Sequence, residues 1–234
     1  MLRLRVKAPF AAFRTFSAGA YRSTAPFITP SSAYGLLLNV AAIETRHDDG
    51  RSPMTVTASG LPSARIALGA VTLPTVQTIY QQLHNYPVGA VSQAALDRSR
   101  GTKPNIQPIR REYLTNLDGY VCLDGNPELE NRVREGLGQG AAFRPDGNPR
   151  YGLPFLGENG FTLSVLREER EPEAAHWYVL ARREDGASVP NPCRLTVWID
   201  RARSANTMVR LYGRQDIAQL DPPDEAWTEI RPPS

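Results

Sequence analysis

Residues 25–44 read Ala25-Pro-Phe-Ile-Thr-Pro-Ser-Ser-Ala-Tyr-Gly-Leu-Leu-Leu-Asn-Val-Ala-Ala-Ile-Glu44, and they predict the first helix of the fold. The Thr29-Pro30-Ser31 triplet is typical of a helix start, because a hydroxyl can cap free N–H groups and Pro needs no donor there. We predict a helix over residues 30–44 with one buried face, since its apolar residues recur at helical spacing. These residues are Tyr34, Leu37, Leu38, Ala41 and Ala42.

The start of this helix has the composition of a phosphate site. Ser31, Ser32 and Gly35 lie in its first turns, and Arg14 and Arg22 precede it. Free N–H groups and the helix dipole favour an anion at a helix N-terminus. Gly35 costs about 1 kcal/mol relative to Ala unless something must approach the backbone closely. The residues alone leave two interpretations open, a phosphate site and an ordinary capped helix packed on a sheet.

A basic strand precedes the helix. Over residues 1–13, Leu2, Leu4 and Val6 alternate with three basic residues, which predicts a strand with one apolar and one basic face. The first 23 residues are also Arg-rich and free of acidic residues, as in an organelle transit peptide. The strict alternation favours the strand.

Charge is unevenly distributed along the 234-residue chain, although its net value is only +3. Residues 1–120 carry 13 basic and 6 acidic side chains, whereas residues 121–234 carry 14 and 18. A molecule polarised in this way suits a polyanion on one side and protein neighbours on the other.

The order of the predicted elements indicates an α+β protein with a ferredoxin-like (RRM-like) core, strand–helix–strand–strand–helix–strand. The core spans residues 1–168, and residues 169–234 form a small C-terminal β region, as a smaller sheet or hairpins, with a polar tail from Asp221. The predicted strands are 1–13, 54–59, 64–72, 113–123, 160–168, 177–181, 195–199 and 208–212, and the predicted helices are 30–44 and 126–137.

A long, irregular and partly basic excursion, residues 74–112, interrupts the core. It is too long for an ordinary connection, and long ordered insertions are usually functional. A flexible surface loop with solvated charge is the alternative. Its basic residues are Arg98, Arg100, Lys103, Arg110 and Arg111.

Few other groups suggest chemistry. Cys122 and Cys193 fit neither a disulfide framework nor a zinc site, which favours a cytoplasmic protein without a metal or cofactor. No run approaches the roughly 18 apolar residues of a membrane span, so we expect no membrane contact. His47-Asp48-Asp49 is typical of a solvated turn, and the glycines of residues 136–140 are typical of a helix terminator.

Three stretches of this chain resemble the CRISPR-associated RAMP proteins, and among them Cas subunit five. The first is the basic strand ending in Phe13-Arg14 together with Phe27-Ile-Thr-Pro-Ser-Ser-Ala-Tyr-Gly-Leu-Leu37. The others are Arg110-Arg-Glu-Tyr-Leu114 and Tyr151-Gly-Leu-Pro-Phe-Leu-Gly157. Their order and spacing cover roughly residues 1–160, and nothing after about residue 165 adds to the resemblance.

The resemblance implies an architectural protein that holds the 5′ handle of a guide RNA (crRNA) in a type I Cascade complex. A thumb within residues 74–112 would grip the RNA, and a glycine-rich loop would lie against RNA or a neighbouring subunit. Implied partners are the guide RNA, the repeating backbone RAMP subunit and the large subunit, with target DNA bound only through the complex. The candidate RNA-binding residues are Arg14, Tyr21, Arg22, Ser31, Ser32, Tyr34, Arg98, Arg100, Lys103, Arg110 and Arg111, and the candidate loop glycines are Gly152, Gly157 and Gly160.

One branch of the family, in type I-C systems, instead cuts precursor guide RNA at a metal-free Tyr, Lys and His site. The nearest counterparts in this chain are Tyr21, Lys103 and His84, and neither of its two lysines is followed by His. We therefore expect no catalytic residues, with a metal-independent endoribonuclease as the alternative.

Overall fold

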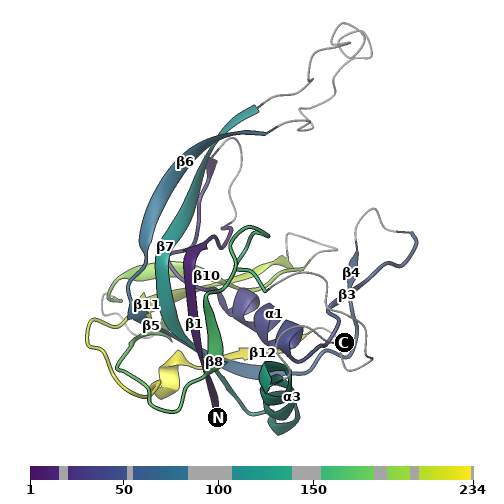
Figure 1. Ribbon diagram of the computed structural model, residues 1–234, viewed down its shortest axis with the longest axis vertical. Coiled ribbons are helices and arrows are strands. Elements are labelled where there is room, and N and C mark those ends of the chain that lie inside the picture. Colours follow the sequence, from purple (N-terminus) through teal and green to yellow (C-terminus); the bar gives the residue numbers. More distant parts are fainter. Residues whose placement is uncertain are drawn as a thin grey trace, which may run out of the picture.

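The structure, a computed structural model, describes residues 1–15, 21–51, 55–83, 107–138, 154–181, 189–200 and 206–232. Within these residues the protein is α+β, with a large and mainly antiparallel sheet and two α-helices that share one hydrophobic core with it. Figure 1 shows the helices against the sheet and a long hairpin that projects from the body.

Four strands form the centre of the sheet, in the spatial order β5–β7–β1–β8. Together with the helices they follow one another along the chain as strand, helix, strand, strand, helix and strand, which is the predicted order. Their bounds are β1 Leu2–Ala11, α1 Pro30–Val40, β5 Ala64–Thr72, β7 Gln107–Asp124, α3 Pro127–Gly138 and β8 Val165–Glu168.

Helix α1 begins where the sequence predicts and ends earlier. Thr29 caps it, accepting a hydrogen bond from the backbone N–H of Ser32 at 3.3 Å, and Pro30 occupies the first turn. The helix stops at Val40, four residues before the predicted end. Ala42 has a positive φ of 53°, and the N–H of Ile43 turns back to the carbonyl of Leu38 at 2.9 Å. This turn satisfies a terminal carbonyl and ends the helix.

The side chains on the two faces of β1 lie in different surroundings. Leu2, Leu4 and Val6 are fully buried against the helices, as their alternation predicts. The residues of the predicted basic face are not free to contribute to a basic surface, because Arg3 and Arg5 are only 6% and 3% exposed. Their guanidinium groups lie near the Tyr120 ring, at 5.5 and 5.0 Å from its centroid.

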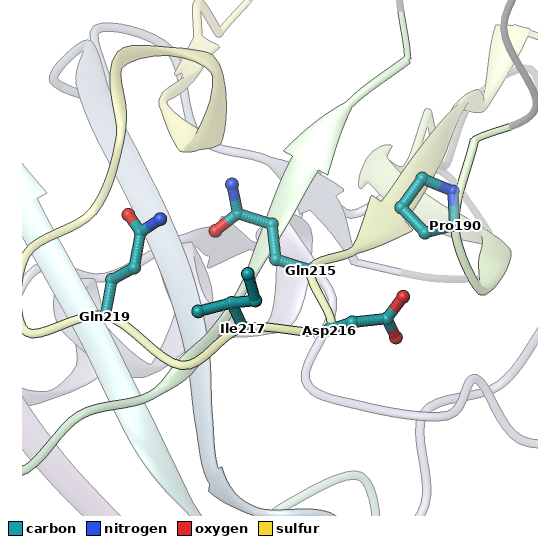
Figure 2. A pocket seen from close by; sticks show the side chains of 5 residues that line it. All are labelled: Pro190, Gln215, Asp216, Ile217 and Gln219. Atoms are coloured by element: carbon teal, nitrogen blue, oxygen red, sulfur yellow. The ribbon is translucent and has the colours of Figure 1, made fainter.

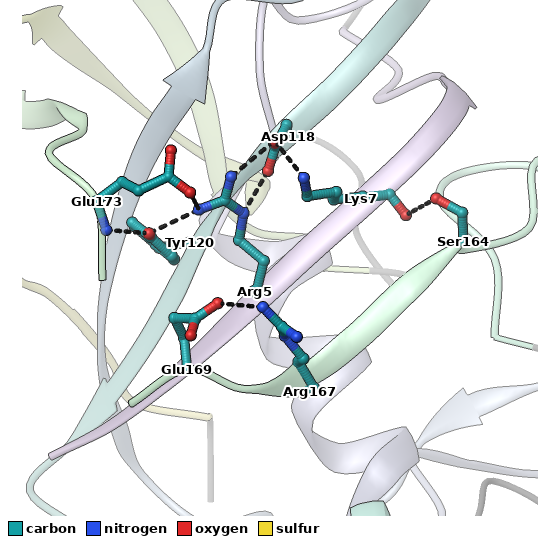
Figure 3. Close-up of polar contacts among 8 residues, drawn as sticks. All are labelled: Arg5, Lys7, Asp118, Tyr120, Ser164, Arg167, Glu169 and Glu173. Carbon is teal, nitrogen blue, oxygen red and sulfur yellow. Dashed lines mark hydrogen bonds and ion pairs between the residues drawn. The ribbon is translucent and has the colours of Figure 1, made fainter. Parts of the chain in front are cut away.

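Acidic side chains from distant parts of the chain neutralise this buried basic face (Figure 3). Arg5 donates two hydrogen bonds to the carboxylate of Asp118, at 2.5 and 2.8 Å, and a third to the hydroxyl of Tyr120 at 2.7 Å. Lys7 pairs with the same Asp118 at 2.9 Å, and Glu173 lies 3.3 Å from Arg5. Arg3 and Arg5 therefore stabilise the fold and are not available to RNA, whereas the side chain of Lys7 is 41% exposed.

The C-terminal strands extend the large sheet instead of forming a smaller one. One end of β5 pairs with β12 and the other with β9, and β9 continues through β11 to β10. The predicted polar tail from Asp221 is also wrong for the residues described, since Asp221 pairs with Arg3 at 2.7 Å and Ile230 is 1% exposed. The bounds are β9 His176–Leu180, β10 Pro192–Trp198, β11 Met208–Arg214, the 3₁₀ helix η2 Asp224–Ala226, and β12 Thr228–Ile230.

The excursion that interrupts the core begins and ends as a regular hairpin. Strand β6 (Thr75–Leu83) pairs antiparallel with the first half of β7, from Thr75 opposite Thr115 to Leu83 opposite Gln107. Strand β7 thus starts at residue 107, six residues before the predicted strand, and the ends of the excursion are not irregular. We call residues 75–83 and 107–115 the arm; it projects away from the body (Figure 1).

Three short strands complete the description. Strand β2 (Tyr21–Arg22) pairs in parallel with strand β7 of the arm, at Arg110 and Arg111. Strands β3 (Arg46–His47) and β4 (Val56–Thr57) form a small separate ribbon, so the strand predicted over residues 54–59 is shorter.

Candidate nucleic-acid interface

Three arginines converge midway along the arm, where Arg111 is paired with Ile79. Arg22 lies beside Arg111 in the β2–β7 pairing, and Arg14 is brought back to this region by its β-bridge with Thr24. Burial lowers the pKa of Arg111, and the positive charges of Arg14 and Arg22 lower it further. We call Arg14, Arg22 and Arg111 the guanidinium cluster; such a concentration of positive charge favours an anion such as phosphate.

One member of the cluster also has a structural role. The Arg111 side chain is only 12% exposed, forms an ion pair with Glu158, and donates a hydrogen bond to Gln81 at 3.3 Å. Glu158 belongs to residues 154–160 of the glycine-rich stretch, so this pair joins that loop to the arm. The sequence offered no signal for it, because Arg111 and Glu158 are far apart in the chain.

Hydrogen bonds to Glu112 connect β2 and the following Thr24 to the arm. The Glu112 carboxylate accepts a hydrogen bond from the hydroxyl of Tyr21 and another from the backbone N–H of Thr24 at 3.0 Å. The hydrogen bond to Glu112 raises the pKa of Tyr21. A tyrosine with a raised pKa is a poor general base, because less of it is deprotonated at neutral pH.

The glycine-rich loop approaches the chain's own backbone. Gly157 has a positive φ of 86°, and a Cβ there would lie 1.6 Å from the carbonyl oxygen of Ala12. The N–H of Ala12 donates to the carbonyl of Leu156 at 3.1 Å, so the loop packs on the segment that follows β1. At Gly160 the corresponding space is open. Close packing therefore requires glycine at residue 157 and not at residue 160.

The first turn of α1 contains two further candidate RNA-binding residues, Ser31 and Ser32. Ser31 and Ser32 are partly exposed there, and their hydroxyls lie 3.1 and 2.9 Å from that of Thr29. Apart from its chain neighbours and the backbone of its own helix, no heavy atom of the described chain lies within 4 Å of a Cβ added at Gly35, so tertiary packing does not explain this glycine. Ser31 and Ser32 form no hydrogen bond with Arg14 or Arg111 in the part of the chain that the structure describes.

Tyr34 must be removed from the candidate RNA-binding residues. It is 4% exposed, its hydroxyl donates to the carbonyl of Pro62 at 2.6 Å, and its ring packs beside that of Trp198. Burial raises its pKa strongly. A buried ring has no free face for a nucleobase, so Tyr34 belongs to the core. The remaining candidates Arg98, Arg100, Lys103 and Gly152, and also His84, lie outside the described residues.

The rest of the described chain offers little chemistry. No group of three or more His, Cys, Asp or Glu residues comes together there as a metal site, and none of its helices is both long and apolar enough to cross a membrane. A shallow pocket near β11 is lined by Pro190, Gln215, Asp216, Ile217 and Gln219 (Figure 2). Its carboxylate, Asp216, accepts a hydrogen bond from Asn191 at 2.6 Å. The lining of this pocket thus provides a single carboxylate, which is already hydrogen-bonded.

A sequence model of the CRISPR-associated protein (Cas_Cas5) family matches residues 1–143, which is more than half of the chain. The chain belongs to the Cas5 family. The resemblance seen in the sequence motifs is thereby confirmed. None of the curated proteins compared with this Cas5-family chain matches it.

One solved structure shares the fold of this chain. A structure described as "CRISPR RNA-guided surveillance complex" is similar with a TM-score of 0.53 and 14% sequence identity, over 96% of this chain and 95% of that chain. Another, described as "Crystal structure of Cas protein", has a TM-score of 0.48 and 15% identity over 93% of each chain.

Proposed function

We propose that this Cas5-family chain binds the 5′ handle of a guide RNA, as an architectural and non-catalytic subunit of a type I Cascade-like surveillance complex. The observation that carries the proposal is the guanidinium cluster midway along the arm, where the β2–β7 pairing and the bridge between Arg14 and Thr24 bring exposed Arg14 together with Arg22 and Arg111. Placing phosphates there would relieve the repulsion among these side chains.

The architecture supports this role. We infer that the core is a ferredoxin-like RAMP domain over residues 1–168, that the arm is the inserted thumb, and that residues 169–234 are an added β region. Bound RNA would place its phosphates on the guanidinium cluster and on Ser31 and Ser32 of α1. The partners in the complex would be the backbone RAMP subunit and the large subunit, with target DNA bound only through the complex, in the cytoplasm.

Binding of handle RNA should depend strongly on salt. Each phosphate that the protein neutralises on a single strand contributes a slope of about −0.7 in log affinity against log salt concentration. Replacing exposed Arg14 with Ala should therefore weaken binding and make the slope less negative by about 0.7. Titrations of labelled repeat-derived handle RNA at several salt concentrations measure both quantities.

The matched control is Arg170→Ala, which removes an exposed arginine outside the guanidinium cluster. This substitution should change neither the affinity for handle RNA nor the salt slope. Equal binding of handle RNA and unrelated RNA, with no dependence on salt, would contradict the proposed function.

The endoribonuclease alternative makes a different prediction. Attack by a 2′-hydroxyl on its own phosphate needs a base, a proton donor and charge stabilisation close together. Arginines stabilise charge but do not shuttle protons, and Tyr21 has a raised pKa. We expect no cleavage of repeat RNA in the presence of a chelator. A discrete product at the handle boundary, lost in Tyr21→Phe or His84→Ala, would establish the nuclease instead.

A further inference from the structure

We infer that the arm carries a nucleobase-stacking platform formed by Tyr21, Arg110 and Tyr80, which takes an unstacked base of single-stranded RNA. The inference rests on the proposed function and adds a specific subsite to it. We call these three residues the Tyr–Arg–Tyr row.

The strand pairing places the row on one face of the arm. Tyr21 on β2 is the register partner of Arg110 on β7, and Arg110 is also the register partner of Tyr80 on β6. Directly paired residues on neighbouring strands project to the same face, and successive residues project to opposite faces. The next row, Arg22, Arg111 and Ile79, therefore faces the other way, so the row is distinct from the guanidinium cluster.

All three side chains of the row are accessible. Tyr80 is 67% exposed and Tyr21 is 43% exposed, and Arg110 is exposed between them. Arg110 forms no hydrogen bond or ion pair with any residue that the structure describes. Packing within the described protein therefore does not explain why Tyr80 and Arg110 are present. Exposed aromatic side chains in a group mark binding surfaces.

Tyr21 is held in place before any ligand arrives. Its hydroxyl donates to Glu112, which lies two residues from Arg110 on the same strand and face. Glu112 is itself held by the N–H of Thr24. A ring fixed in this way loses little conformational entropy when a base stacks on it, which favours binding.

The chemistry of the row fits a base better than a phosphate. Tyrosine rings and the guanidinium plane of arginine both stack on nucleobases, and every base has such a face. Strand β6, which supplies Tyr80, reads Thr-Val-Gln-Thr-Ile-Tyr-Gln-Gln-Leu and contains no charged residue. This side of the arm therefore offers ring faces with a single cation, whereas the guanidinium cluster offers charge.

The test compares RNA with and without bases. Tyr80→Ala should lower the affinity for repeat-derived handle RNA by about tenfold to a hundredfold, since stacking of one base has that effect. The affinity for an abasic ribose-phosphate oligomer of the same length should not change. Tyr80→Phe should restore handle binding, because it keeps the ring. Thr78→Ala is the matched control, since Thr78 is exposed on the same strand and face.

The outcomes separate this inference from the proposed function. Wild-type binding with the expected salt slope, together with unchanged affinity in Tyr80→Ala, would overturn the platform and leave the function standing. Equal losses of affinity for handle RNA and for the abasic oligomer in Tyr80→Ala would also overturn the platform. If Tyr80→Ala binds RNA normally but fails to assemble into the complex, the row is a protein contact and the platform is overturned as well. Failure of the wild-type protein to bind handle RNA at all would overturn both.

Discussion

Replacing Asp118 with Asn should lower the free energy of unfolding by about 3 kcal/mol, because it removes the anion that neutralises a buried arginine. Arg5 is 3% exposed, and Asp118 accepts two of its hydrogen bonds and pairs with Lys7. Two other carboxylates lie near Arg5: that of Glu173 is on a side chain that is 71% exposed, and that of Glu169 is paired with Arg167. Chemical denaturation of both proteins at neutral pH measures the loss.

The matched control is Glu173→Gln, which removes the exposed partner of the same arginine. It should cost less than about 1 kcal/mol, since ion pairs in water contribute little. If the two substitutions have equal effects, Asp118 does not neutralise the basic face of β1 as the structure indicates.

The Asp118 effect should also depend on pH. Burial alone would raise the pKa of Asp118, but hydrogen bonds from Arg5 and Lys7 and their charges together bring it below its ordinary value. A carboxyl with a lowered folded-state pKa stabilises the protein above its unfolded-state pKa, and the stabilisation disappears as pH falls through the folded-state pKa. The difference between wild type and Asp118→Asn should therefore be full at neutral pH and shrink in acid. A difference that is constant with pH would contradict the ionic origin.

Replacing Gly157 with Ala should cost about 3 kcal/mol of folding stability, since it combines backbone strain with a steric clash. The φ of Gly157 is positive, and its new Cβ would lie 1.6 Å from the carbonyl oxygen of Ala12, which is backbone and has little freedom to move. The loop would have to leave its place beside Ala12. The melting temperature and the denaturation midpoint should both fall.

Gly160→Ala provides the control within the same loop. Its Cβ meets open space, so stability should stay within about 0.5 kcal/mol of wild type. Gly160→Ala also tests whether RNA approaches this loop, because it should weaken handle binding only if the RNA backbone lies against it. A large loss of stability in Gly160→Ala, or none in Gly157→Ala, would contradict the packing described here.

Local sequence signals were sufficient for the elements of the core. The Thr29-Pro30-Ser31 start of α1 and the alternation of β1 depend on neighbouring residues only, and both are confirmed. The end of α1 was missed because Ala42, which adopts a positive φ, is not a residue that usually ends a helix. The start of β7 was missed because Gln107–Glu112 reads as polar and basic, and its strand conformation comes from pairing with β6.

The candidate site could be predicted only in part. Basic residues near the insertion were visible in the sequence, and the structure brings Arg14, Arg22 and Arg111 together midway along the arm. Tyr34 was misassigned because its helical spacing fits a buried face and an RNA-facing residue equally well. Tyr80 could be recognised only from its register partner, Arg110.

The sequence by itself determined the strand–helix–strand–strand–helix–strand order of the core elements, and that the N-terminal half would be basic. Only the tertiary structure decided where that charge lies. Arg3 and Arg5 are buried because Asp221, Asp118 and Glu173, all more than 100 residues away along the chain, come to rest beside them. Arg14 and Arg110 have no such partners among the described residues and are exposed. The physical reason is that a charge is buried only where long-range packing supplies its counter-charge, and no local pattern encodes that pairing.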